Sequence, residues 1–136
     1  MLETAAALSP TVARLIAALQ QSDVIVVVGT GALLSADVNG LAHVFAVGPD
    51  VRYVRVLLKI PNDRRNLMRV LGHELQHALE MAGMPHARDG QSLAAAYSRI
   101  GVPMVGDNYF ETDAAVRVGQ VVARELEARV GKGSRR

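Results

Sequence analysis

The order of hydrophobic and polar positions predicts a helix near the start of the chain, strands in its first half and helices in its second. Ser9-Pro10 is typical of a helix start, with serine as the N-cap and proline at the first helical position. Apolar residues then repeat at helical spacing until about Gln21. Helical spacing returns over residues 66–83, over a short segment at 91–100, and from residue 109 or 110 to about 130.

Three short apolar runs predict strands. The β-branched run Val24–Val28 predicts a buried strand, and Gly29-Thr30-Gly31 after it predicts a plain turn, because it lacks the lysine and spacing of a phosphate-binding loop. Asn39-Gly40 is typical of a two-residue hairpin turn. Leu41–Val47 and Val51–Ile60 predict two further strands, joined by a glycine–proline turn.

Apolar and polar residues alternate along the strand predicted over Val51–Ile60, so that one of its faces is expected to be buried and the other wet. This profile is typical of an antiparallel strand at or near a sheet edge. Tyr53 and Arg55 lie on the wet face and would contact a substrate if the strand is exposed. The pattern as a whole predicts an α+β fold with a small, mostly antiparallel sheet.

Length and charge narrow the class of protein. The 136 residues suffice for one hydrophobic core, so we assign 1–130 to a single domain and 131–136 to a disordered basic tail. A net charge of +2, few aromatic residues and no basic stripe predict no nucleic-acid partner. The sequence shows no membrane span and no secretory signal, which predicts a cytoplasmic chain. A secreted or periplasmic location is expected instead if the sequence is a trimmed piece.

The clearest chemical signal is the H-E-x-x-H motif at His73-Glu74-Leu75-Gln76-His77, inside the helix predicted over residues 66–83. Side chains four residues apart lie on one face of a helix, so His73 and His77 can direct two ring nitrogens at one zinc ion. Glu74 is offset around the helix from both histidines, which suits a general base acting on a zinc-bound water. The alternative is a helix that carries these residues by chance.

A catalytic zinc needs a third protein ligand, and with no cysteine in the chain it must be a histidine or a carboxylate. The metzincin pattern is excluded, because Glu80 and Gly83 stand where it needs glycine and histidine. His43 falls in a predicted strand and is expected to be a surface or hairpin histidine. The candidates that remain are Glu80, His86, Asp89, Asp107, Glu111 and Asp113.

Glu111 is the favoured candidate. It opens the last predicted helix beside small residues that would let this helix pack closely on the motif helix, and it would complete a His₂Glu site. The alternative is a first-turn acid favoured by the helix dipole. Glu80 and Asp113 are expected either to orient a ligand from outside the metal shell or to be solvated, and His86 is expected to be a solvated loop histidine.

The order of a strand, the H-E-x-x-H helix and a helix that begins Glu111-x-x-Ala114 resembles the gluzincin group of zinc metallopeptidases. The last segment is similar to the third-ligand segment of the HtpX-like and CAAX-protease-like branch, although this chain has no membrane spans. The resemblance implies a zincin-like domain over roughly residues 51–126, in which an edge strand lies over the motif helix and the C-terminal helix carries the third ligand. It implies one Zn²⁺ held by His73, His77 and Glu111, with Glu74 as the general base.

The resemblance also implies that Val51–Ile60 is the rim of the cleft and pairs with an extended peptide by strand addition. Gluzincins often add a tyrosine or histidine that stabilises the oxyanion; Tyr109 is the local candidate, with Tyr97 behind it, and core or rim positions are the alternative for both.

The sequence therefore predicts a zinc metallopeptidase of the endopeptidase type that acts on a peptide or protein substrate. The alternative is a non-catalytic zincin-like domain that uses zinc for stability or binds a partner peptide at its edge strand, and hydrolysis of a non-peptide amide is a weaker third hypothesis. The intact Glu74 favours the enzyme, because a structural zinc site has no need of it. The sequence indicates no oligomeric state.

Overall fold

The structure is a computed structural model of the whole chain. It describes residues 1–31, 38–60, 62–89, 91–92, 95, 102–103 and 110–133.

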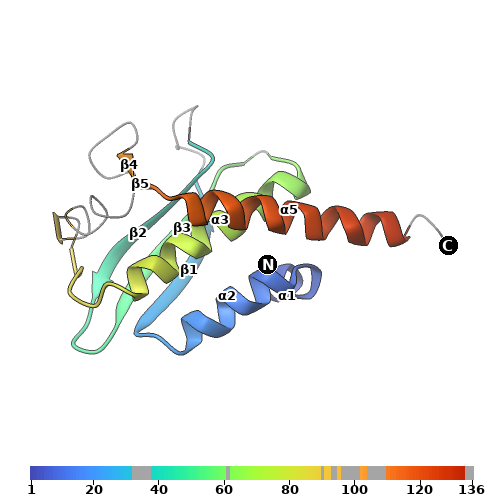
Figure 1. Cartoon of the computed structure of the whole chain (residues 1–136). Coiled ribbons are helices and arrows are strands. Elements are labelled where there is room, and N and C mark those ends of the chain that lie inside the picture. The colour runs from blue at the N-terminus through green and yellow to red at the C-terminus, as the bar shows by residue number, and fades with distance from the viewer. Residues whose placement is uncertain are drawn as a thin grey trace.

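Four helices form one layer of the described part of the chain: α1 (Leu2–Leu8), α2 (Pro10–Gln20), α3 (Arg64–Ala82) and α5 (Asp113–Gly133). Figure 1 shows them gathered on one side of the sheet, with α3 and α5 side by side. The helix start predicted at Ser9-Pro10 is confirmed, because the Ser9 hydroxyl accepts a hydrogen bond from the Val12 backbone N–H at 3.1 Å. The short α1 before it was not predicted.

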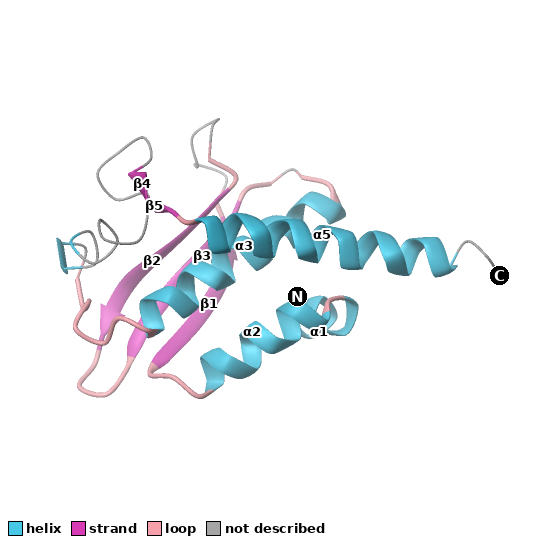
Figure 2. Cartoon of the chain, viewed as in Figure 1, coloured by secondary structure: helices cyan, strands magenta, loops and turns pink. Residues whose placement is uncertain are grey.

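The second layer is a three-stranded sheet of β1 (Val24–Thr30), β2 (Gly40–Val47) and β3 (Arg52–Leu58) in the order β1-β3-β2 (Figure 2). β1 runs parallel to β3 and β2 runs antiparallel to it. Two further strands of two residues each, β4 (Val102–Pro103) and β5 (Phe110–Glu111), pair with each other in a separate antiparallel sheet. The predicted α+β class is confirmed, but the sheet is mixed rather than mostly antiparallel.

The core lies between the two layers. Val54, Val56 and Leu58 of β3 are at most 1% exposed and face the helices. They pack with Leu71 and Leu75 of α3, which are each 1% exposed. A central strand between two neighbours excludes water from its inner face more completely than an edge strand does, which accounts for the near-total burial of these residues.

Two glycines let α3 and α5 pack closely. A Cβ added at Gly72 would lie 2.7 Å from the Val122 side chain, and one added at Gly119 would lie 3.1 Å from the Arg69 carbonyl oxygen. Contacts run from Arg65–Glu127 at one end to Glu80–Thr112 at the other, so the two helices are antiparallel. The predicted packing of the last helix on the motif helix agrees with these contacts, although the close approach is at Gly72 and Gly119 rather than at the small residues beside Glu111.

The end of α3 is fixed to the sheet by a buried arginine. Arg52, the first residue of β3, is 0% exposed and pairs with Asp23 through two hydrogen bonds of 2.6 and 2.8 Å. Its guanidinium also donates to the carbonyl oxygens of Met81, Met84 and Ala87 at 2.8–3.0 Å. These carbonyls lie at and just beyond the C-terminus of α3, so one side chain holds the helix end against β1 and β3.

Several predicted boundaries were wrong. The strand predicted over Val51–Ile60 is the central strand of the sheet, not an edge strand, because β1 occupies the side that was expected to be free. Asn39-Gly40 is not a hairpin turn: Gly40 begins β2, and Gly29 and Thr30 belong to β1.

The C-terminal boundaries also differ. The last helix begins at Asp113, so the third-ligand candidate Glu111 lies in β5 before the helix and not on it. Residues 131–133 of the predicted basic tail are part of α5, and 134–136 lie outside the described residues. Most of the helix predicted over 91–100 also lies outside them.

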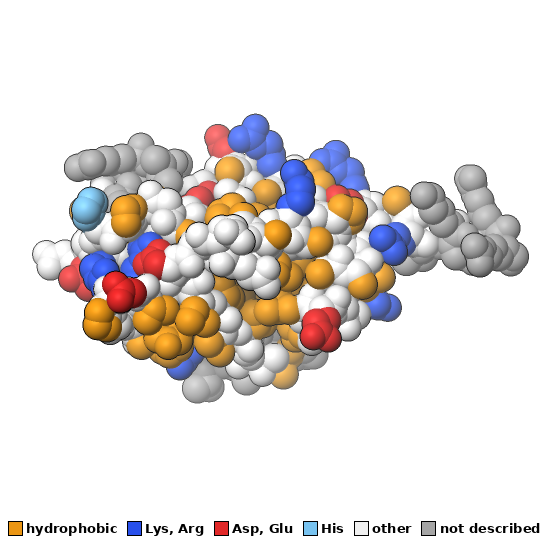
Figure 3. All heavy atoms as spheres, turned by 90° about the horizontal axis from the view of Figure 1, so that it is seen from below, with side chains coloured by type: hydrophobic (Ala, Val, Ile, Leu, Met, Phe, Trp, Pro, Cys, Tyr) orange, Lys and Arg blue, Asp and Glu red, His pale blue; other side chains and the backbone are white. Residues whose placement is uncertain are grey.

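No described helix covers the outer face of the three-stranded sheet. Ile25 and Val27 of β1 are 48% and 45% exposed there, and Phe45 of β2 is 39% exposed. Seen from below, hydrophobic side chains gather toward one end of the molecule (Figure 3). Arg55 extends over the Phe45 ring, 4.4 Å from its centre, in a cation–π contact on the same outer face.

Candidate metal centre

Helix α3 brings the two motif histidines together. It is capped by Asp63, whose carboxylate accepts from the Asn66 backbone N–H at 2.8 Å, and it continues without interruption through both histidines. His73 and His77 therefore lie one turn apart, and their Nε2 atoms are separated by 3.2 Å. Each of the two side chains directs its Nε2 atom at the same point.

Glu111 reaches this point from β5. Its Oε1 lies 3.0 Å from His73 Nε2 and 3.4 Å from His77 Nε2. The Thr112 backbone N–H donates to the same oxygen at 3.0 Å, which fixes the direction of the carboxylate. Within the described part of the chain, these three residues offer one ligand atom each, all within 4.8 Å of one another.

The donor set suits zinc. Two imidazole nitrogens and one carboxylate oxygen are the ligands of a catalytic His₂Glu site, in which one position remains for water or substrate. Two donors at about 2.0–2.1 Å from a tetrahedral zinc lie about 3.4 Å apart. The separations of 3.0, 3.2 and 3.4 Å among these three atoms are close to that value.

In the metal-free chain, protons hold the group together. Burial disfavours the charged form of His77, but hydrogen bonds to Glu111 and Glu80 outweigh it and raise the pKa of His77 to about 9. Burial acts to raise the pKa of the Glu111 carboxyl, whereas its hydrogen bonds with His73 and His77 act to lower it. The hydrogen bonds outweigh burial, so the pKa of Glu111 lies far below its ordinary value. A proton thus stands between ligand atoms where a metal cation would replace it.

Glu74 lies beside the group in a dry position. Its side chain is 7% exposed, and burial raises the pKa of the carboxyl although both histidines act to lower it. Gly40 of β2 forms the adjacent wall: a Cβ added there would lie 3.0 Å from Glu74 Cγ and 2.5 Å from Val70 Cγ1. Glu74 is thus a carboxylate with increased proton affinity near three converging ligand atoms.

Glu80 lies behind His77 rather than among the three ligand atoms. Its Oε1 is 2.9 Å from His77 Nδ1, the ring nitrogen that faces away from Glu111. Its Oε2 accepts a hydrogen bond of 2.7 Å from the hydroxyl of Thr112. This is the position expected of a carboxylate that orients a ligand. The sequence reasoning missed Thr112, although a threonine before an acidic first turn is a helix N-cap signal.

The other candidates lie apart from the group or outside the described residues. His86, Asp89 and Asp113 are exposed, and the interpretation of His86 as a solvated loop histidine agrees with this. His43 is half-buried in β2, and its Nδ1 is buried with no hydrogen-bond partner in the described part of the chain. Asp107, Tyr97 and Tyr109 lie outside the described residues.

The substrate contacts predicted at Tyr53 and Arg55 depended on an exposed rim strand, and the structure places both residues elsewhere in the sheet. Both residues lie on β3, the central strand, and alternate with Arg52, Val54 and Val56, whose side chains face the helices. Their side chains therefore lie on the outer face of the sheet, away from α3 and its histidines.

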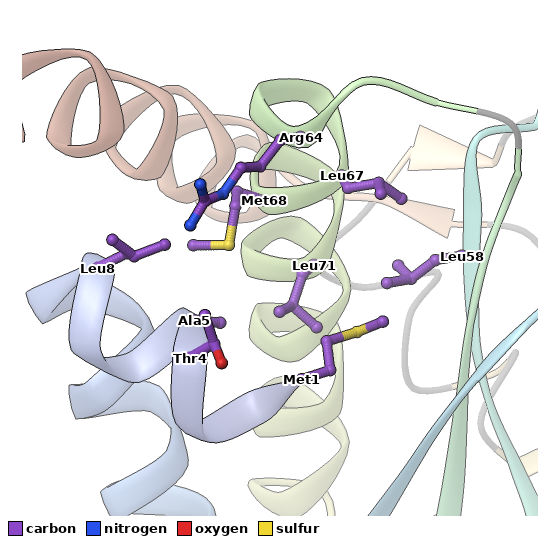
Figure 4. A pocket seen from close by; sticks show the side chains of 9 residues that line it. All are labelled: Met1, Thr4, Ala5, Leu8, Leu58, Arg64, Leu67, Met68 and Leu71. Carbon is purple, nitrogen blue, oxygen red and sulfur yellow. The ribbon is translucent and has the colours of Figure 1, made fainter. Parts of the chain in front are cut away.

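A separate apolar cavity of about 240 Å³ lies between α1 and α3 (Figure 4). Leu67 and Leu71 line it from α3, on average about 120° around that helix from His73 and His77, and none of the three ligand candidates lines it. The cavity is therefore not part of the metal centre.

The chain showed no significant match to models of known protein families, to curated proteins or to solved structures. None of the helices in the described part of the chain combines the length and apolar character that crossing a bilayer requires.

Proposed function

We propose that this protein is a zinc-dependent peptidase, with zinc held by His73, His77 and Glu111 and with Glu74 as the general base. The observation that carries the proposal is the convergence of His73 Nε2, His77 Nε2 and Glu111 Oε1 within 4.8 Å of one another, beside the buried Glu74. When bound there, zinc would supply a Lewis acid that polarises a carbonyl and acidifies a water.

Glu74 would move the proton. A carboxylate whose pKa is raised by burial holds a proton more firmly than a solvated one, so it can take a proton from attacking water and return it to the leaving amine. Gly40 and Val70 enclose Glu74 and would keep bulk water from competing for that proton. A site that only stabilised the fold would gain nothing from such a group.

An extended peptide is the substrate form that the sheet favours. β2 is the outer strand on the side of the described sheet that contacts Glu74, through Gly40 at its first position. A peptide that pairs with an outer strand gains backbone hydrogen bonds without needing a particular sequence. In this proposal β2, rather than the strand in Val51–Ile60, would be the rim that pairs with the peptide.

The test compares the wild type with Glu74→Gln on a quenched-fluorescence peptide mixture, with zinc content measured in parallel. We expect Glu74→Gln to retain zinc and to lose about 10²- to 10⁴-fold in turnover, the usual contribution of a general base. Glu127→Gln is the matched control, since it makes the same change on an exposed position of α5 and should leave both quantities unchanged. Chelation should abolish hydrolysis, and added zinc should restore it.

Two outcomes would contradict the proposal. A wild type that binds no zinc after reloading would remove the metal centre. A wild type that binds one zinc but hydrolyses nothing, or that hydrolyses peptides as fast with Gln at position 74, would favour the non-catalytic zincin-like domain.

A further inference from the structure

A closed ring of contacts joins α3 to the two residues that precede α5, and part of it lies on the side of His77 away from the three ligand atoms. It runs from His77 Nδ1 to Glu80 Oε1 (2.9 Å), from Glu80 Oε2 to the Thr112 hydroxyl (2.7 Å), and through the chain from Thr112 to Glu111. Glu111 Oε1 closes the ring on His77 Nε2 at 3.4 Å. Two of the ligand candidates are thus connected both in front, at the ligand atoms, and behind, through Thr112.

Thr112 makes three distinct contacts from one buried position, where it is 7% exposed. Its hydroxyl donates to Glu80, and its hydroxyl oxygen accepts from the Ala115 backbone N–H at 3.1 Å, which caps α5. Its own backbone N–H donates to Glu111 Oε1 at 3.0 Å. The residue therefore couples the start of α5, the direction of Glu111 and the carboxylate behind His77.

The direction of these hydrogen bonds determines what they do to His77. A carboxylate at Nδ1 keeps the proton on that nitrogen, which leaves the lone pair of Nε2 for a metal. Glu80 can do this only while its carboxylate is correctly turned. The hydroxyl of Thr112 donates to the other oxygen and so holds the carboxylate in this orientation.

We propose that Thr112 is a positioning residue of the metal centre, which acts on His77 through Glu80 and on Glu111 through its own backbone. The inference rests on the proposed function only in that a metal binds at His73, His77 and Glu111. It requires no particular substrate and no catalytic activity. Thr112 touches neither metal nor substrate, so its effect appears in metal affinity and in the geometry of the bound metal.

The experiment replaces Thr112 by Val and by Ser and measures zinc affinity by competition with a chromophoric chelator. Valine keeps the branched shape and removes the hydroxyl, whereas serine keeps the hydroxyl and removes a methyl group. We expect Thr112→Val to weaken zinc binding about tenfold, at the lower end of the range for residues that orient metal ligands, and Thr112→Ser to restore it to within about threefold of wild type. The visible spectrum of bound Co²⁺ should change in Thr112→Val and return in Thr112→Ser.

Loss of the α5 cap needs its own control, because a less stable chain also loses affinity. Asp63→Ala removes the N-cap of α3, at the Asn66 backbone N–H, and touches none of the three ligand candidates. It should lower the melting temperature and leave the zinc affinity and the Co²⁺ spectrum unchanged. If Thr112→Val acted only by removing the cap of α5, it too would lower the melting temperature and leave the zinc affinity and the Co²⁺ spectrum unchanged.

A double-mutant cycle tests the route through Glu80. If Thr112 acts on His77 through that carboxylate, Thr112→Val should add little to the loss already caused by Glu80→Gln. Should Thr112→Val fail to fold, Glu80→Gln alone, which keeps the α5 cap, must still weaken zinc binding and alter the Co²⁺ spectrum.

The inference is overturned if Thr112→Val binds zinc as tightly as wild type with the same Co²⁺ spectrum, or if Ser at this position is no better than Val. A wild type that binds neither zinc nor Co²⁺ overturns both the inference and the proposed function. A wild type that binds metal but cleaves no peptide removes the proposed function alone, and the Thr112 result then still decides the inference.

Discussion

Two groups of charged side chains contact α3, one around Arg52 at the C-terminus of the helix and one at the motif histidines, and they differ in the partners of their charged atoms. At the helix C-terminus, Arg52 directs its guanidinium at Asp23 and at backbone carbonyl oxygens, so each of the two charges has its partner inside the chain. At the motif histidines, Glu111 Oε1 and two Nε2 atoms converge on one another. In the metal-free chain, contacts of Glu111 with His73 and His77 join them.

The difference separates a cluster whose bonds hold the fold together from one whose ligand atoms converge on a single point. Arg52 is 0% exposed, and its guanidinium donates hydrogen bonds to Asp23 and to backbone carbonyl oxygens. A ligand would have to displace these bonds, which hold the fold together. At the histidines, three acceptors of a cation face one point, and a buried carboxylate of raised pKa, Glu74, lies next to them. The same kinds of residue thus stabilise the fold in one place and offer converging ligand atoms in the other.

The largest effect on stability is expected at the structural cluster. Arg52→Met should lower the free energy of unfolding of the metal-free chain by about 3–5 kcal/mol, because Asp23 and the carbonyls at the end of α3 lose their buried partner. Urea denaturation measures it. Arg65→Ala is the control: the Arg65–Glu127 pair is as short, at 2.6 Å, but more than half exposed, so less than about 1 kcal/mol is expected. Equal losses in both variants would contradict the structural interpretation of Arg52.

The same two regions show how far the sequence could predict the molecule. The pairing of His73 with His77 follows from helix geometry alone, and the small residues near Glu111 predicted the close approach of the last helix. Spacing along one helix is local information. Since both histidines lie on an uninterrupted helix, nothing remote could change their relation.

The main error concerns a contact between distant segments, and the others concern local boundaries. The alternation in Val51–Ile60 reads the same for an edge strand and for a central strand with one open face, and only the parallel partner β1 decides between them. Arg52 lies on the same face of that strand as Val54 and Val56, and its charge is tolerated there because Asp23 and the end of α3 supply its partners. Glu111 was predicted to lie on the last helix. From the sequence alone, an acidic residue before Thr112-Asp113 can belong to the first turn of a helix or stand one residue before its N-cap, and the two cases look alike.

Gly40→Ala tests whether the wall beside Glu74 belongs to the site. The new Cβ would lie 2.5 Å from Val70 Cγ1 and 3.0 Å from Glu74 Cγ, so we expect a loss of about 1–3 kcal/mol in unfolding free energy from overpacking. Because Glu74 is displaced and the three ligand candidates are not, hydrolysis should fall while zinc affinity stays near the wild-type value. Gly29→Ala is the control, since a Cβ there meets only Leu57 at an ordinary 3.7 Å. Equal turnover in both variants would show that β2 does not constrain Glu74.

The smallest effect, about a tenfold change in zinc affinity per pH unit, comes from the proton that the metal must replace. With its pKa raised to about 9, His77 is almost fully protonated at pH 7 in the metal-free chain. An imidazolium cannot coordinate a metal, so zinc binding should release about one proton, and the affinity should fall as the pH is lowered below 9. Calorimetry at pH 7 in two buffers of different ionisation enthalpy counts this proton. Glu80→Gln removes one of the carboxylates that raise the pKa of His77, so it should release fewer protons at pH 8. Zinc binding without proton release would mean that His77 is already neutral in the metal-free chain. The contrast with the Arg52 cluster, whose charges are paired within the chain, would then not lie in a proton that a metal must displace.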